Sequence, residues 1–296
     1  MKYYLMIVLA VILLAGDFAV NKLYQKRYGT SLETGLKFNA LMGLFTAIIF
    51  FAINGFKFEF SAFSVLMAGI VALSIMSYNI LGFRVLKSGS MAFYTLFLMC
   101  GGMFVPYVWG VLFLHEKLSL MHLAGLILII SAIALTANDK KMPGKRILAL
   151  CVIIFFLNGI SSVAAKMHQI EKTYFCITET EFVIATGIAK FIIAAIAYMA
   201  VKIGKKDKKA DKCNKSGFAW GVLLIVLSTL LSGLSYILQL NGAKNLPATV
   251  LYPLITGGTI IFSSLTGIIF FKEQISKKLI LSIIICFAGT CMFLQQ

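Results

Sequence analysis

Four charged residues lie inside long apolar stretches of this sequence: Asp17, Lys37, Glu181 and Lys190. A charge at the centre of a bilayer costs about 2.5–3.5 kcal/mol on insertion scales, so such residues usually face a cavity or an opposite charge. An acid in apolar surroundings can take up a proton, which makes Asp17 a candidate for proton coupling. No sequence neighbour can pair with Lys190, so we expect it to line a cavity or to meet an acid on another helix.

Lys37 and Glu181 occupy matching places in two related segments, where opposite charges could bridge the two halves of the chain or bind a zwitterion. Each also has a local explanation. Lys37 follows Glu33 by four residues, which is a favourable helical pair. Both lie a turn or two from a segment end, where a long side chain can reach the interface. Asp17 has a similar alternative as an interfacial acid.

Uncharged polar side chains in the same apolar stretches extend the candidate cavity. Asparagine and glutamine in a spanning helix need hydrogen-bond partners, because lipid supplies none. Bonds between helices would satisfy them equally well, so packing is an alternative role for each of them. The candidates are Asn21, Asn39, Tyr78, Asn79, Tyr94, Thr95, Asn158, Ser161, Tyr236, Gln239 and Tyr252.

Ten apolar segments must position these residues. The chain of 296 residues is 60% apolar and 13% charged, whereas a soluble domain has about 45–50% apolar and about 25% charged residues. A spanning helix needs about 20 mostly apolar residues. Ten segments qualify: 3–21, 34–53, 62–83, 89–113, 119–137, 147–167, 177–201, 217–240, 246–271 and 276–294. The sequence therefore predicts an all-α integral membrane protein with ten transmembrane helices.

The remaining composition excludes several other classes. The net charge of +16 comes mainly from Lys and Arg in short gaps between apolar runs, as expected for contacts with lipid headgroups rather than with nucleic acid. The six cysteines form no CxxC pair, so neither a metal site nor a disulfide framework is indicated. No GxxxxGK[ST] loop is present, which argues against an ATP-driven pump in this one chain. We expect no cofactor.

An internal repeat organises the ten segments. A shift of 157 places the third to fifth segments on the eighth to tenth, and Gly101 then meets Gly258. A shift of 144 relates the first two segments to the sixth and seventh, and Lys22 then meets Lys166. Five crossings are an odd number, so the second copy must enter the membrane from the opposite side. The prediction is two inverted five-helix repeats, 1–138 and 146–296, an arrangement that transporters use for alternating access.

The chain resembles the drug/metabolite transporter superfamily, specifically its EamA-like members with two five-helix repeats. The resemblance lies in the Glu-containing junctions 114–125 and 271–282, in Lys37-Phe38, and in Leu251-Tyr252-Pro253. It implies a ten-helix exporter or exchanger of amino acids, other metabolites or drugs. Such a protein has a central cavity and is driven by a proton gradient or by exchange.

The orientation of the chain has two conflicting expectations. The resemblance implies that both termini lie in the cytoplasm. The gaps after odd-numbered segments hold nineteen Lys or Arg residues and the opposite side holds six. The positive-inside rule therefore predicts that both termini lie outside.

The leading interpretation is a multi-pass secondary transporter of the cell (plasma or inner) membrane. Its partners are then a small-molecule substrate and the lipid bilayer, and small-residue contacts permit a homodimer. The alternatives are an intramembrane lipid or prenyl transferase, a flippase for lipid-linked sugars, a channel, or a non-catalytic membrane subunit. The enzyme alternative lacks the expected chemistry, because no HExxH motif and no Asp-rich cluster at a segment end is present.

Overall fold

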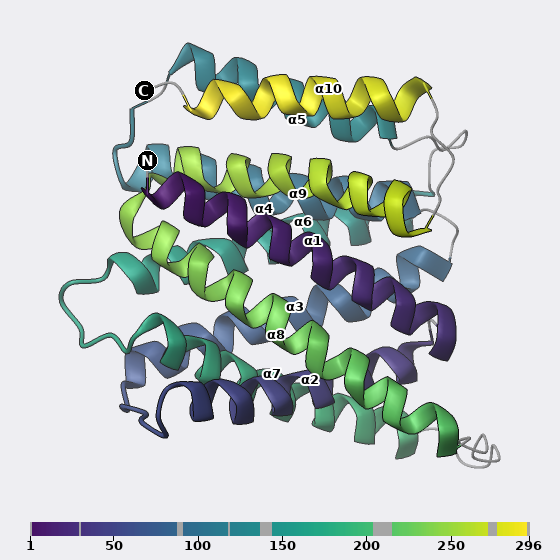
Figure 1. Cartoon of the computed structure of the whole chain (residues 1–296). Helices are drawn as coiled ribbons and strands as arrows, with labels where there is room; N and C mark the ends of the chain where they lie inside the picture. Colours follow the sequence, from purple (N-terminus) through teal and green to yellow (C-terminus); the bar gives the residue numbers. More distant parts are fainter. Residues whose placement is uncertain are drawn as a thin grey trace.

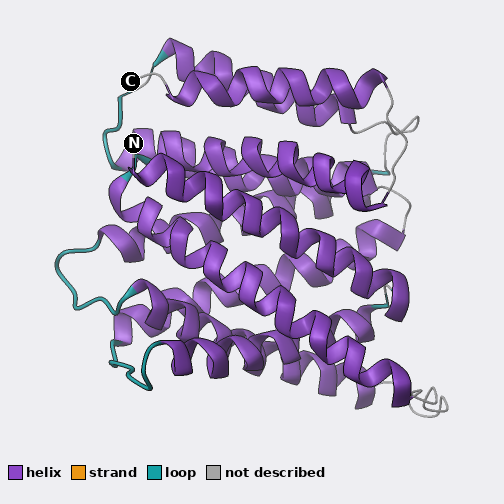
Figure 2. Cartoon of the chain, in the orientation of Figure 1, coloured by secondary structure: helices purple, strands orange, loops and turns teal. Residues whose placement is uncertain are grey.

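The described part of the chain folds into α-helices. The computed structural model describes residues 2–29, 31–87, 91–117, 119–136, 144–203, 215–271 and 277–294. Within these ranges ten α-helices and a short 3-10 helix, η1 (Met292–Leu294), form and no strand is found (Figure 2). The α-helices are α1 (Lys2–Tyr28), α2 (Leu32–Ile53), α3 (Ala62–Lys87), α4 (Met91–Phe113), α5 (Leu120–Thr136), α6 (Lys145–Ile170), α7 (Glu179–Ile203), α8 (Lys215–Asn245), α9 (Ala248–Phe271) and α10 (Lys277–Cys291).

These helices confirm the predicted all-α membrane fold. Within the described residues, seven helices are long and apolar enough to cross a bilayer, and α4, α5 and α10 contain shorter apolar stretches. Many large apolar side chains on these helices are exposed, as a lipid-facing surface requires. Both termini lie at the same face of the bundle (Figure 1), in agreement with an even number of crossings.

Two helices run beyond their predicted apolar segments. The apolar segment 3–21 continues through seven further residues to Tyr28, and α1 stops only where Gly29 adopts a positive φ of 85°. A left-handed backbone is readily accessible to glycine, which makes it a common helix terminator. α2 then starts on Ser31, whose hydroxyl oxygen accepts a bond from Thr34 N at 3.1 Å. Local capping therefore fixes the turn between α1 and α2.

The helices pack in layers whose pairs follow a regular rule (Figure 1). α1 packs on α8, and α6 packs on α3; the second pair follows from the first by exchanging each helix for the one five places along the chain. The same exchange relates the α1–α9 pair to α6–α4, and the α3–α7 pair to α8–α2. It leaves three pairs unchanged, α2–α7, α4–α9 and α5–α10, which lie where the two halves meet.

Glycines permit close crossings, among them that of α2 with α7. A Cβ on Gly43 of α2 would lie 2.7 Å from Phe191 N and 2.8 Å from Gly187 O of α7. A Cβ on Gly187 would in turn lie 3.0 Å from the Thr46 side chain of α2. Gly43 and Gly187 are related by the shift of 144 found in the sequence. The two backbones therefore touch at equivalent positions, and only glycine leaves room for this approach.

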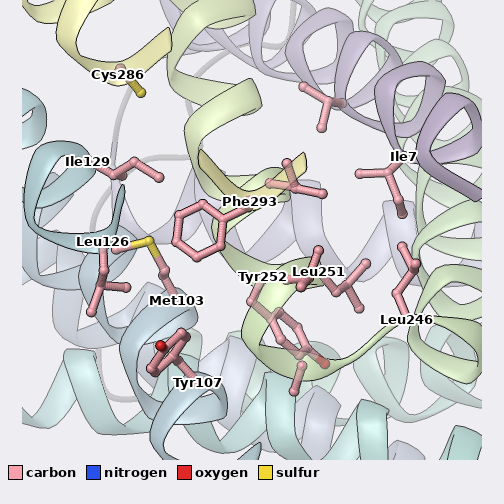
Figure 3. Packing of buried hydrophobic residues seen from close by; sticks show 14 of the residues in the cluster. Ile7, Met103, Tyr107, Leu126, Ile129, Leu246, Leu251, Tyr252, Cys286 and Phe293 are labelled. Atoms are coloured by element: carbon pink, nitrogen blue, oxygen red, sulfur yellow. The ribbon is translucent and has the colours of Figure 1, made fainter. Parts of the chain in front are cut away.

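The largest buried apolar cluster joins helices from both halves. It contains Ile7 of α1, Met103 and Tyr107 of α4, Ile129 of α5, and Tyr252 of α9, with Cys286 and Phe293 at the C-terminal end (Figure 3). A second cluster is centred on Phe50 and Phe182, where α2 and α7 meet α3 and α6. Among the polar candidates, Tyr252 belongs to the first cluster and Tyr236 packs against the second.

Candidate functional site

Asp17 is buried in the interior of the bundle. Its side chain lies on α1 and the residue is 5% exposed. The Ser228 hydroxyl of α8 donates to Asp17 Oδ1, and Ser228 Oγ also lies 3.3 Å from Asn21 Oδ1, one turn further along α1. Asp17 is therefore an interior acid, and the interfacial alternative does not describe its surroundings.

Lys190 supplies the opposite charge from the other half of the chain. It lies in the middle of α7, is partly buried, and its Nζ donates to Met42 Sδ of α2 at 3.5 Å. A thioether is a weak acceptor. Asp17 and Lys190 carry opposite charges, and no direct ion pair joins them within the described residues. Burial is the larger electrostatic influence on both groups, and the opposite charge of each offsets part of it.

The structure does not bring Lys37 and Glu181 together. Lys37 Nζ lies 3.5 Å from Glu33 Oε1 and 5.3 Å from the centre of the Tyr198 ring, and its side chain is 52% exposed. Glu181 Oε2 accepts bonds from Thr178 N at 2.9 Å and Thr178 Oγ1 at 2.8 Å. The Thr178 hydroxyl oxygen accepts Glu181 N in return, at 3.4 Å.

This reciprocal pattern is a capping box at the start of α7. Glu181 Oε1 also accepts Glu59 N at 3.0 Å, which ties the α2–α3 loop to α7. Both Lys37 and Glu181 therefore have local structural partners. Of the four charged candidates, Asp17 and Lys190 lie in the middle of their helices.

Several uncharged candidates connect helices to one another. Tyr252 Oη donates to Ser162 O at 2.6 Å, which links α9 to α6. Gln239 Nε2 donates to Ser235 Oγ at 2.9 Å, and Ser235 Oγ donates to Ala10 O at 2.6 Å, which links α8 to α1. Tyr236 Oη is buried and has no hydrogen-bond partner within the described residues. Of these candidates, the Tyr236 hydroxyl alone is left to be satisfied by a ligand or a water.

Further candidates lie on α3, α4 and α6. Asn158 Nδ2 donates to Leu98 O at 2.7 Å, which is a helix–helix bond of the packing type. Tyr78 packs beside the buried cluster of Val85, Cys151 and Ile154. Asn79 is partly buried on α3. Tyr94 belongs to α4, but its side chain lies outside the part that the structure describes.

Sequence analysis missed a pair of charges at the turn between α8 and α9. Lys166 of α6 is 3% exposed, and its Nζ donates to Ala243 O at 2.5 Å and to Leu246 O at 2.6 Å. Glu116 Oε1 accepts Ala248 N at 2.7 Å, and its Oε2 accepts Thr249 N at 2.8 Å. We call these four bonds the α8–α9 clamp.

Each charged residue of the clamp bonds to backbone groups at one helix end that have no partner inside the helix. The ammonium of Lys166 faces the last carbonyls of α8, and the carboxylate of Glu116 faces the first amides of α9, as the helix dipoles favour. The two charges also interact with each other. Glu116 reaches this place because His115 adopts a positive φ of 53° after α4 and Glu116 N bonds back to Gly110 O at 3.2 Å. The sequence did contain a signal for this site. Lys166 lies inside the predicted segment 147–167, whereas lysines that flank a spanning helix lie outside the apolar segment.

A serine–histidine pair lies at the same face of the bundle. His168 Nε2 is 2.8 Å from Ser64 Oγ, and Gln169 Nε2 is 2.9 Å from His168 Nδ1. Ser64 Oγ also accepts Ile177 N at 3.2 Å, and the His168 ring stacks on Phe182. Ser64 and His168 are fully buried. In this conformation the pair ties α3, α6 and the loop before α7 together and is not exposed to a substrate.

The apolar helices of the described residues, with Asp17 buried and Lys190 partly buried among them, define a multi-pass integral membrane protein. Residues 146–295, half of the chain, match the EamA-like transporter family, and the chain belongs to this family. It is therefore a membrane transporter of small molecules, embedded in a lipid bilayer. No curated protein sequence matches it.

One solved crystal structure of another protein shares the whole fold. The alignment covers 98% of this chain and 96% of the other, with a TM-score of 0.75 and 14% sequence identity. At this identity the likeness shows the fold alone.

Proposed function

We propose that this chain is a secondary transporter that moves small zwitterionic metabolites, such as amino acids, or amphipathic drugs across the cell membrane by alternating access. The observation that carries the proposal is a pair of opposite charges inside the bundle: Asp17 on α1 is buried and accepts a bond from Ser228, and Lys190 on α7 is partly buried and donates to Met42. Such charges are costly inside a membrane and mark substrate pathways. A role as an exporter or exchanger is part of the proposal, and the match to a transporter family supports it.

The chemistry of the pair favours a zwitterion. A substrate ammonium would pair with Asp17 and a substrate carboxylate with Lys190. In the empty protein the two residues compensate each other, and in the loaded protein the substrate compensates both. A ligand with a single charge would leave one protein charge unpaired in a medium of low dielectric constant. The unsatisfied Tyr236 hydroxyl adds a donor and an acceptor on α8.

The proposal includes two inverted repeats, residues 1–138 and 146–296. Its support is the rule that relates the helix pairs, together with the reciprocal contact of Gly43 and Gly187. The family match falls on the second of these units. Inverted repeats provide two openings of similar energy around one central site. A homodimer and a location in the plasma membrane remain predictions.

The test is transport by the purified protein in liposomes with an imposed pH gradient. The panel contains neutral amino acids, amphipathic cations and organic anions. We expect gradient-dependent uptake of at least one zwitterion, reduced at least tenfold by Asp17→Asn and by Lys190→Gln. Lys37→Gln is the matched control, because it removes an exposed charge and should keep full transport. Full activity in both interior variants would remove these two residues from the mechanism.

A further inference from the structure

A pocket of about 260 Å³ opens on the outside of the bundle between the ends of α4 and α6. Four of its lining residues are apolar or aromatic: Trp109, Leu114, Met167 and Ile170. The other two are the neighbouring charges Glu171 and Lys172. The pocket is therefore apolar on one side and charged at its rim.

The position of the pocket coincides with the membrane boundary. α4 ends at Phe113 and α6 ends at Ile170, so the apolar lining belongs to the last turns of two spanning helices or follows them directly. Glu171 and Lys172 come after the end of α6. Tryptophan is enriched at this level of the bilayer. The Trp109 ring stacks on the Phe113 ring, with 6.3 Å between the ring centres. Phospholipid is the molecule that surrounds this level.

The charge at the rim is balanced and partly fixed. Glu171 Oε1 accepts Lys172 N at 2.9 Å and Thr173 N at 2.6 Å. These backbone donors hold the pKa of the Glu171 carboxyl below its usual value, so it stays ionised at neutral pH. Lys172 is exposed, and within the described residues no ion pair engages either side chain. An anionic headgroup would meet both attraction and repulsion here.

We propose that this pocket binds a zwitterionic phospholipid, with its phosphate on Lys172, its ammonium on Glu171, and its first acyl carbons on Leu114, Met167 and Ile170. The Trp109 ring offers a further surface for the ammonium group. A headgroup of this kind matches both rim charges at once, whereas an anionic lipid matches only one. The inference does not rest on transport.

The lipid site adjoins the α8–α9 clamp. Met167 follows Lys166 directly on α6, and Trp109 precedes Gly110, whose carbonyl accepts Glu116 N. Met167 is exposed on the outside of the bundle, whereas Lys166 is buried. A lipid bound on the outside would therefore stabilise the packing of α4 on α6. Lys166 of the clamp lies on α6, and Glu116 follows the end of α4.

The test is lipid retention by the purified full-length protein, measured by native mass spectrometry. The probes are phosphatidylethanolamine and phosphatidylglycerol with identical acyl chains, offered in equal amounts. We expect the protein to retain phosphatidylethanolamine at least threefold better. Glu171→Gln keeps a carbonyl oxygen for the backbone donors but removes the negative charge, so the preference should reverse toward phosphatidylglycerol. Lys172→Gln should lower retention of both lipids.

Lys57→Gln is the control, because it removes a charge from the α2–α3 loop at the same face without touching the pocket. It should leave the headgroup preference unchanged. Equal retention of the two lipids by the unmodified protein would overturn the proposal. So would an identical response to Glu171→Gln and Lys57→Gln. Unfolding curves of each variant show whether a change in lipid retention comes from loss of the binding site or from loss of the folded protein.

Discussion

Lys166 and Glu116 hold the two sides of a single turn: the ammonium bonds to Ala243 O and Leu246 O, and the carboxylate bonds to Ala248 N and Thr249 N. They come from α6 and from the loop after α4, so helices of both halves meet at this turn. The turn also joins α8 and α9, which carry Tyr236 and Tyr252 of the candidate cavity. The placement of these two tyrosines therefore depends on Lys166, which is buried, and on Glu116, which is partly buried.

Replacing Lys166, the positive charge of the α8–α9 clamp, should destabilise the protein strongly. In Lys166→Met the carbonyls of Ala243 and Leu246 lose their donor and Glu116 loses its neighbouring positive charge. Leaving buried groups unsatisfied costs about 1–3 kcal/mol each, so we expect a loss in this range in denaturation experiments in mixed micelles.

Lys244→Met is the matched control for the clamp. Lys244 lies at the end of α8 with its side chain 60% exposed, and its Nζ is 3.6 Å from Glu179 Oε1. An exposed pair contributes at most about 1 kcal/mol. Equal destabilisation by the two substitutions would contradict the structural role of Lys166.

The coupling between Asp17 and Lys190 can be measured with a double-mutant cycle. Asp17→Asn alone leaves Lys190 as an uncompensated interior charge, and Lys190→Gln alone does the same to Asp17. The double variant has no interior charge at this place. We expect it to be more stable than the sum of the single effects predicts, because the two groups interact. Strictly additive free energies of unfolding would show that the charges do not interact.

Glu181 should affect stability rather than transport. Glu181→Ala removes the acceptor for Thr178 N and Glu59 N, and loss of a helix cap costs about 0.5–2 kcal/mol. Lys37→Ala should change the free energy of unfolding by less than about 1 kcal/mol, because its pair with Glu33 is exposed. Liposome transport by a folded Glu181→Gln protein should remain close to normal. A loss of transport in that variant without a loss of stability would restore Glu181 to the substrate path.

A methyl group at Gly43 should separate α2 from α7. Its Cβ would lie 2.7 Å from Phe191 N, a backbone atom that cannot move independently. Overpacking of this kind costs about 1–3 kcal/mol, and Gly43→Ala should show it. Gly69→Ala in α3 is the control, because no atom lies within 4 Å of the added Cβ. There alanine should stabilise the helix by up to about 1 kcal/mol. Stabilisation by both substitutions would mean that the α2–α7 contact is looser than described.

Hydropathy predicted each of the ten helices but not all of their ends. The apolar segment 217–240 covers the residues that match the thickness of the bilayer. α8 continues to Asn245, because helical backbone hydrogen bonds do not stop where the apolar residues stop. Asp17 and Lys190 could be identified from the sequence, because a charged residue stands out among apolar neighbours. Their neighbours Ser228 and Met42 could not, because serine and methionine are ordinary residues in a spanning helix. Lys166 was counted as a flanking charge, since its carbonyl partners lie more than seventy residues away.

The crossing of Gly43 with Gly187 has a mechanical consequence. At 1.5 Å per residue, the ends of α2 lie roughly 15 Å from this point along the helix axis. A tilt of about 10° around it would carry each end by about 3 Å while barely disturbing the two glycines. The close backbone contact of Gly43 and Gly187 thus lies near the midpoint of α2, where a tilt of this helix displaces its atoms least.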